Sequence, residues 1–251
     1  MSSNYEEVKK FADQQLGEMP QVIELLFGMD ENSAMEQFLQ NKTLYLGRTS
    51  LALKTRILIA ISTALANGPK ESAFIHFKLA KKFGIEPKEI LDAMRITKMV
   101  LMSSTLDSVY ELVKAYGELP RDQAENAEVV SILDDLQKKG GMVPDRVKSA
   151  SLFSTNLLKE HLREKKVMLT PLKIQTKDVY AIALGVSASI RDRECQKVYL
   201  NQFLRNGGSR EEAEDVLTTV RFLSGNRAYV NGIEILKNMN YQNNFRENVP
   251  P

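Results

Sequence analysis

The sequence contains only one cysteine, Cys195, among its 251 residues, and it contains no tryptophan. One cysteine cannot form an intramolecular disulfide, so a disulfide-stapled secreted fold is excluded, and so is a zinc site built from several thiolates. The N-terminus lacks the basic and then apolar run of a secretory signal peptide. No apolar stretch approaches the roughly 20 residues that a membrane-spanning helix needs. We therefore expect a cytoplasmic protein that does not enter a membrane.

The sequence also lacks an excess of charge of either sign. Its 34 basic and 32 acidic residues are interspersed and leave a formal net charge of +2. This balance excludes the one-sided basic surface of a nucleic-acid binder. No P-loop, dinucleotide fingerprint or metal-ligand spacing is present, so we expect neither a cofactor nor a metal ion.

Apolar residues recur at helical spacing through most of the chain, and no strand-like alternation of useful length competes with them. The sequence therefore predicts an all-α protein. The predicted helices cover residues 4–18, 20–40, 51–66, 69–83, 87–116, 123–138, 145–164, 174–189, 191–205, 209–223 and 226–238, with a connector at 41–50.

Local signals mark several helix ends. Asp30 or Asn32 is a suitable N-cap for a helix that begins near Ser33. Thr49 or Ser50 is a suitable N-cap for the apolar helix 51–66. The length of helix 87–116 predicts a break near its Ser-Ser pair at 103–104.

The segment 67–84 is the most informative stretch. Pro69 suits the first turn of a helix, and Gly84 suits its left-handed end. Ser72 and His76 are four residues apart and therefore share one helix face. The second histidine of the chain, His161, stands among charged residues, and we expect it on a solvated face.

The two halves of the chain align without a gap when the sequence is shifted by 123 residues. The matches include a helix-stop glycine and the acidic residues of the next helix, positions with a structural role. The matched pairs are Lys54 and Lys177, Ile59 and Ile182, Ala60 and Ala183, Glu71 and Glu194, Gly84 and Gly207, Glu89 and Glu212, and Asp92 and Asp215.

These matches predict an internal duplication with four parts. Residues 1–120 form the first repeat with extra N-terminal helices, and residues 121–144 form a linker with one short helix. Residues 145–240 form the second repeat, and residues 241–251 form a polar tail that we expect to be mobile unless a partner subunit holds it.

An apolar helix, then a short helix with a central histidine, then the run Ala-Lys-Lys-Phe-Gly-Ile-Glu-Pro-Lys-Glu-Ile at 80–90 resembles the carboxymuconolactone decarboxylase and alkylhydroperoxidase D (AhpD-like) superfamily. The resemblance implies two tandem helical repeats that form one compact bundle. It also implies a homo-oligomer. Single-repeat relatives pair two repeats, so a trimer of this two-repeat chain would rebuild a ring of six.

The redox members of that family carry Cys-x-x-Cys-x-x-x-His on the short helix, with a relay Glu twelve residues before the first Cys. The resemblance carries these positions to Ile57, Pro69, Ser72 and His76 in the first copy, and to Tyr180, Asp192, Cys195 and Tyr199 in the second. The dithiol motif is therefore degenerate in both copies. Tyr180 and Tyr199 either hydrogen-bond in a pocket or fill the core.

The sequence leaves three functions open, and with them the question of whether the protein is an enzyme. His76 could act as an acid or base on a small organic molecule, with Ser72 as its hydrogen-bond partner. Cys195 could serve a thiol-dependent peroxidase or disulfide reductase, although acidic neighbours raise the pKa of a thiol and no resolving cysteine is present. The third alternative is a non-catalytic binding or assembly protein that uses the same helical pocket.

Overall fold

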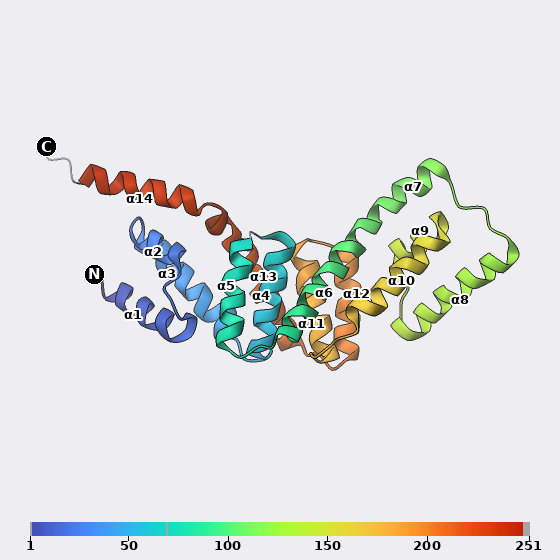
Figure 1. Cartoon of the computed structure of the whole chain (residues 1–251), viewed down its shortest axis with the longest axis horizontal. Helices are drawn as coiled ribbons and strands as arrows, with labels where there is room; N and C mark the ends of the chain where they lie inside the picture. The colour runs from blue at the N-terminus through green and yellow to red at the C-terminus, as the bar shows by residue number, and fades with distance from the viewer. Residues whose placement is uncertain (1, 69, 248–251) are drawn as a thin grey trace. The chain divides into compact units, whose positions relative to one another are not determined.

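The computed structural model describes residues 2–68 and 70–247, and it describes their side chains as far as Tyr241. All secondary structure in this part of the chain is helical (Figure 1), which confirms the all-α prediction. None of the described helices has the length and apolar character to cross a bilayer.

The helices follow one another with short connections. They are α1 (Ser3–Phe11), π-helix η1 (Ala12–Leu16), α2 (Gln21–Phe27), α3 (Glu31–Gln40), π-helix η2 (Asn41–Leu46), α4 (Leu53–Asn67), α5 (Lys70–Lys82), α6 (Pro87–Thr105), 3₁₀-helix η3 (Leu106–Ser108), α7 (Val109–Tyr116), α8 (Gln123–Gly140), α9 (Asp145–Phe153), α10 (Thr155–Leu169), α11 (Thr176–Ser189), α12 (Arg193–Arg205), α13 (Arg210–Asn231) and α14 (Ile233–Glu247).

The chain packs into two compact units that do not follow the order of the sequence. The first unit contains the residues up to Glu86 and those from Arg210 onward, and the second unit is Pro87–Ser209. In the first unit α4 and α5 pack on α13, and in the second unit α11 and α12 pack on α6. Each unit therefore combines two helices of one predicted repeat with the third helix of the other.

Several predicted helices are interrupted. The predicted helix 20–40 breaks after Phe27, and Asp30 caps α3 as expected by accepting a hydrogen bond from the Ser33 N–H at 2.9 Å. The predicted helix 145–164 breaks at Ser154, whose extended backbone begins α10. The break expected near 103–104 lies at η3, a few residues further on. The end of the predicted helix 4–18 is the π-helix η1.

The predicted connector 41–50 and its cap are wrong. The connector contains the π-helix η2, and α4 begins only at Leu53. The N-cap residue of α4 is Ala52, and no side-chain hydrogen bond caps it, so neither Thr49 nor Ser50 has that role. The backbone N–H of Leu51 instead donates to a carboxylate from α13, a contact that no local pattern predicts.

The helical ends of the chain also differ from expectation. Helix α13 runs past Leu223 to Asn231, and α14 continues to Glu247, so much of the predicted tail is helical. Gly84 has φ +67°, and the Ile85 N–H donates to the Ala80 carbonyl at 2.9 Å, which confirms the left-handed helix stop. Pro69 lies outside the described residues.

Two buried aspartates hold corresponding loops in the two units. In the second unit Asp92 accepts hydrogen bonds from the backbone N–H groups of residues 172–174 at 2.8–3.3 Å. In the first unit Asp215 accepts from the Leu51 N–H at 2.8 Å. Positions 92 and 215 differ by 123, as do positions 51 and 174. The offset seen in the sequence therefore relates equivalent contacts in the structure.

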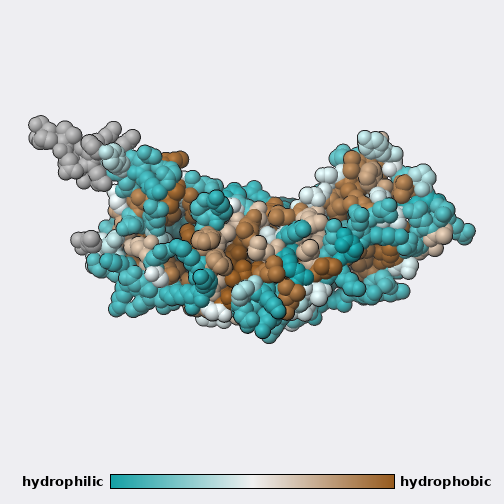
Figure 2. Space-filling model, in the orientation of Figure 1, coloured by the Kyte–Doolittle hydropathy of each residue, from teal (hydrophilic) through white to brown (hydrophobic). Residues whose placement is uncertain are grey.

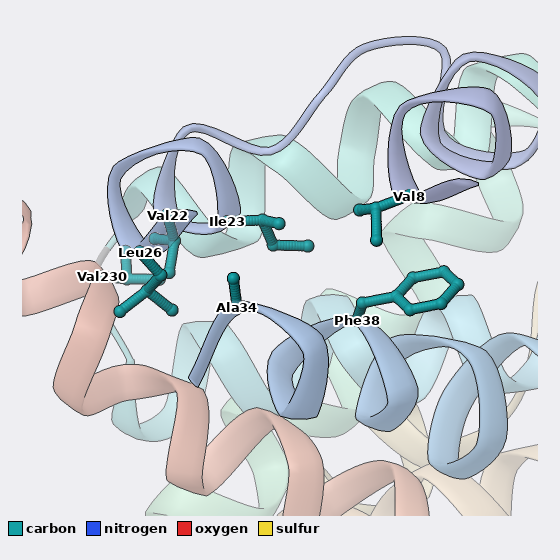
Figure 3. Packing of buried hydrophobic residues seen from close by; sticks show 7 residues of the cluster. All are labelled: Val8, Val22, Ile23, Leu26, Ala34, Phe38 and Val230. Carbon is teal, nitrogen blue, oxygen red and sulfur yellow. The ribbon is translucent and has the colours of Figure 1, made fainter. Parts of the chain in front are cut away.

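The first unit has an apolar cluster between its N-terminal helices and α13. Its buried side chains converge in Figure 3 and comprise Val8, Val22, Ile23, Leu26, Ala34, Phe38 and Val230. Burial of these side chains fixes α1 to α3 against the end of α13, at the hydrophobic free energy of about 25 cal/mol per Å² of apolar area. This packing places residues 16–23 and α14 around one cavity, which is described below.

The surface carries exposed apolar side chains as well as charged ones, and Figure 2 shows hydrophobic patches within a mostly hydrophilic face. The exposed fractions of Phe74, Ile75, Met94 and Leu217 are 48–61%. Such side chains are compatible with association between chains. The trimer of two-repeat chains stays a prediction.

The buried aspartates give a first test of the fold. Asp92 also forms an ion pair with Arg95 at 2.9 Å. Asp92→Ala should lower the free energy of unfolding by about 3–5 kcal/mol, the range for breaking a buried, hydrogen-bonded ion pair. Asp92→Asn should cost less because it keeps an acceptor oxygen. Urea denaturation measures both.

The control variant is Asp135→Ala, because Asp135 forms an exposed pair with Lys139 and should change stability little. An Asp92→Ala protein as stable as this control would contradict the structural role of Asp92.

Candidate functional site

The first unit contains a cavity of about 970 Å³. Its walls come from α5, from η2, from residues 16–23, and from α13 and α14. Apolar side chains such as Phe222 and Leu79 share the lining with a few buried polar groups, including Ser72 and His76. This composition is typical of a site for a small organic molecule.

His76 lies on α5 with 6% of its surface exposed, and it lines the cavity. Its Nδ1 atom is 3.2 Å from the hydroxyl of Tyr45, and the two rings meet edge to face at 87°. Burial lowers the pKa of His76 to about 4, so the imidazole is neutral at pH 7. Burial also raises the pKa of Tyr45, so the phenol keeps its proton.

The pair has two hydrogen-bonded forms. When the Tyr45 hydroxyl donates to Nδ1, the ring proton of His76 is on Nε2. In the other tautomer Nδ1–H donates to the phenol oxygen, and Nε2 is free to accept a proton. In both forms one ring nitrogen of His76 remains available to a bound molecule.

Two contacts hold Tyr45 in place, and a tight turn ends the helix that carries it. The Arg56 guanidinium donates to the Tyr45 carbonyl and, at 3.1 Å, to the Leu51 carbonyl. The Phe222 ring stacks on Tyr45 with centroids 5.9 Å apart. After η2 the chain turns at Gly47, where a Cβ atom would lie 2.2 Å from the Lys42 carbonyl oxygen. Only glycine fits this turn, which ends the π-helix that carries Tyr45.

Sequence reasoning missed Tyr45 and proposed Ser72 as the partner of His76. Ser72 does line the cavity, but among the described residues no hydrogen bond joins it to His76. The one available signal for the Tyr45 contact was Arg56, a charged residue directly before the apolar run 57–61 of α4. It needed a partner, and the structure gives it the carbonyls of Tyr45 and Leu51.

The second unit has a buried ion pair, whereas the first unit has the pair of Tyr45 and His76. Arg146 from α9 is buried there and donates to both carboxylate oxygens of Asp192, at 2.6 and 2.7 Å. It also donates to Glu194 at 3.0 Å, to the Ser103 carbonyl at 2.9 Å and to the Cys195 sulfur at 3.3 Å. Arg146 was not singled out from the sequence, because these partners and Asp107, 3.0 Å away, are distant from it along the chain.

Cys195 is buried beside this ion pair, with 5% of its surface exposed. Burial, and then the negative charge of Asp192, raise the pKa of the thiol to about 12, although Arg146 opposes this. At neutral pH the thiolate that redox chemistry needs is therefore scarce.

The two tyrosines at family positions lie in the second unit as well. Tyr199 is 1% exposed, and burial raises its pKa, so it is a protonated core residue with the Lys165 ammonium 5.5 Å above its ring. Tyr180 on α11 is half-buried, and burial raises its pKa too. Within the described part of the chain no hydrogen bond or ring contact joins Tyr180 to Tyr199.

The prediction that His161 lies on a solvated face is wrong. His161 is 5% exposed, and burial lowers its pKa to about 4, with smaller contributions from Lys165 and Arg146. The charged residues next to it in sequence suggested an exposed helix face, but α10 packs against α6 and α9.

No metal site accompanies these clusters. Among the side chains described in residues 2–68 and 70–241, no three histidine, cysteine or carboxylate groups are arranged so that they could hold a metal ion.

The two buried histidines predict how stability depends on pH. Each has a folded-state pKa of about 4, below the ordinary value of 6.5, so below pH 6.5 the unfolded chain binds more protons. The contribution of the neutral histidines to the free energy of unfolding is fully present above pH 6.5, and it is lost as the pH falls toward 4. At pH 5 the loss should be about 2 kcal/mol for each histidine.

Urea denaturation of the wild type and of His76→Gln at pH 7 and pH 5 measures this effect. The difference in stability between the two proteins should shift by about 2 kcal/mol in favour of His76→Gln at pH 5. A difference that is the same at both pH values would contradict a buried neutral His76.

Cys195 gives a test by thiol labelling at pH 8. A pKa of about 12 in place of the ordinary 9.0 lowers the thiolate fraction about a thousandfold, and burial restricts access further. The native protein should therefore react far more slowly with a disulfide reagent than the protein unfolded in concentrated guanidinium chloride. Cys195→Ser supplies the blank, and rapid labelling of the native wild type would contradict the buried, protonated thiol.

Comparison with known proteins places this geometry in a family. A crystal structure from Burkholderia xenovorans LB400, provisionally named a gamma-carboxymuconolactone decarboxylase subunit, matches 95% of this chain and 98% of its own with a TM-score of 0.77. At 14% sequence identity this likeness shows the fold alone. The comparison with curated proteins finds no match. The profile described as "Carboxymuconolactone decarboxylase family" matches residues 33–115 and 165–238, more than half of the chain. The protein therefore belongs to the carboxymuconolactone decarboxylase family, with two copies of the family's helical repeat.

Proposed function

We propose that the cavity of the first unit binds a small organic molecule and that His76 acts on it as an acid or base. The observation that supports this most directly is the buried pair of His76 and Tyr45 on the wall of a 970 Å³ cavity. At the corresponding position of the second unit, Tyr199 replaces His76, and Arg146 with its carboxylate partners stands beside Cys195.

The lowered pKa defines how His76 would work. A neutral imidazole in an apolar wall is a poor base toward water, because the proton it gains places an unpaired charge in a buried site. A bound molecule that develops negative charge as it loses a proton would pair with that charge. Proton transfer to Nε2 is then favoured when the cavity is occupied, and Tyr45 keeps the ring oriented through Nδ1.

The thiol-dependent alternative has less support. A peroxidase or disulfide reductase needs a reactive thiolate and a resolving thiol. Cys195 is buried with a raised pKa, the arginine that donates to its sulfur is already paired with Asp192, and the chain contains no second cysteine. The third alternative, a non-catalytic binding protein, would use the same cavity and differs only in turnover.

The test uses NMR to monitor whether the protein converts any member of a panel of lactones and small carboxylates. On a substrate that the wild type converts, His76→Ala should lower kcat/KM by roughly 10²–10⁴-fold, the usual contribution of a positioned acid or base. Tyr45→Phe keeps the ring contacts and removes the hydroxyl, so it should lower kcat/KM by a smaller factor.

The matched control is His161→Gln, because His161 is the other buried histidine and lies in the second unit. It should leave turnover unchanged. Full activity of a folded His76→Ala protein would contradict the proposal. A wild type that binds members of the panel but converts none would identify a binding protein.

A further inference from the structure

Among the polar residues that line the cavity, the buried ones and the charged ones are different residues. The buried ones are all uncharged, since His76 is neutral: Gln37, Asn41, Tyr45, Ser72 and His76, each at most 8% exposed. The charged ones all have exposed or partly exposed side chains: Glu18, Lys70, Glu71, Lys78, Lys82, Glu234 and Lys237. Two further uncharged lining residues, Asn226 and Gln21, are partly buried and exposed, respectively. The charges therefore lie where the cavity meets solvent, and its buried wall is neutral.

Most of the rim lysines already have partners. Lys78 is 3.0 Å from Glu18, and Lys237 is 2.7 Å from Glu234. Lys82 donates to the Gln14 carbonyl at 2.8 Å. An anionic ligand would have to replace these contacts in a region that water screens, so the rim offers it little net gain.

Three amide side chains stand together on the cavity wall. Gln37 Nε2 donates to Asn226 Oδ1 at 2.9 Å, and Asn41 Nδ2 donates to the backbone carbonyl oxygen of Gln37 at 2.9 Å. Gln37 and Asn41 come from α3 and η2, and Asn226 comes from α13. We call these three residues the amide cluster. Each side-chain amide has one acceptor and two donor hydrogens, so the cluster keeps unused groups of both kinds for a ligand.

The chemistry of the amide cluster discriminates between ligands. A hydroxyl or carbonyl group that enters the cavity exchanges water for amide hydrogen bonds at little net cost. A carboxylate must also lose its hydration, and no positive group in the buried wall compensates for that loss. The apolar side chains nearby, such as Phe222 and Val230, suit the hydrocarbon part of the molecule.

We propose that Gln37, Asn41 and Asn226 select an uncharged oxygen-bearing group, a hydroxyl or a carbonyl, on a largely apolar ligand, and that a carboxylate is excluded from this wall. This inference rests on the proposed function, because it specifies the molecule that the same cavity accepts. The amide cluster thereby acts as a specificity determinant beside His76.

The test compares ligands of one shape that differ in charge. The pairs are 2-acetylnaphthalene with 2-naphthoate and acetophenone with benzoate, titrated by calorimetry at pH 7 into the full chain. Each methyl ketone should bind at least roughly tenfold more tightly than its carboxylate. Gln37→Leu and Asn226→Leu should each weaken ketone binding by about tenfold, the effect of one lost hydrogen bond.

Gln40→Leu is the matched control, since Gln40 lies on α3 one turn from Gln37, does not line this cavity, and donates to Glu36 instead. It should bind both ligands as the wild type does. The ketone-to-carboxylate ratio within one variant is independent of how much of that variant is folded, so a destabilised protein still tests the selectivity.

The outcomes separate this inference from the proposed function. Carboxylates that bind as tightly as ketones, with binding that His76→Ala weakens, would overturn the selectivity and leave the cavity as the site. Wild-type protein that binds no member of either pair would overturn the proposed cavity ligand as well. Ketone preference that survives both leucine variants would assign the selectivity to residues other than the amide cluster.

Discussion

The buried carboxylate of Asp215 is the contact on which the first unit depends. It accepts the Leu51 N–H at 2.8 Å and pairs with Arg48 at 2.6 Å, and so it fixes the chain just before α4. Helix α4 carries Arg56, which holds the backbone of Tyr45. Tyr45 then orients His76. A chain of charge-assisted and neutral hydrogen bonds thus runs from α13 to the candidate catalytic ring, and burial strengthens its inner members.

The second unit keeps the carboxylate and replaces the rest. Asp92 holds residues 172–174 as Asp215 holds Leu51, but the position of Arg56 is occupied by Val179 and that of His76 by Tyr199. Arg146 occupies the site instead. The buried aspartate holds the equivalent loop in both units. The residues at the positions of Arg56 and His76 do not take part in that contact and therefore differ between the two units. The two units therefore share the aspartate contact and differ in the residues of the site.

The cavity takes part of its wall from residues outside the family match. Residues 16–23 precede the matched segment 33–115, whereas the lining residues of α13 and α14 lie inside the matched segment 165–238. The apolar cluster of Figure 3 holds these parts together, because Val22, Ile23 and Val230 belong both to that cluster and to the cavity lining. Packing of the N-terminal helices on α13 thus shapes the proposed ligand site, to which the neutral amide cluster would give selectivity.

The sequence by itself determined the features that are local or periodic. Helical spacing predicted the all-α class, Gly84 predicted a helix stop because glycine adopts positive φ without strain, and the offset of 123 residues predicted the duplication. Only the tertiary structure decided the long-range contacts. The loop before α4 is held by a carboxylate 164 residues away, and His161 is buried although its sequence neighbours are charged. Tyr45 and His76 meet across 31 residues. Such contacts depend on which helix faces pack together, and the period of one helix does not specify its partner.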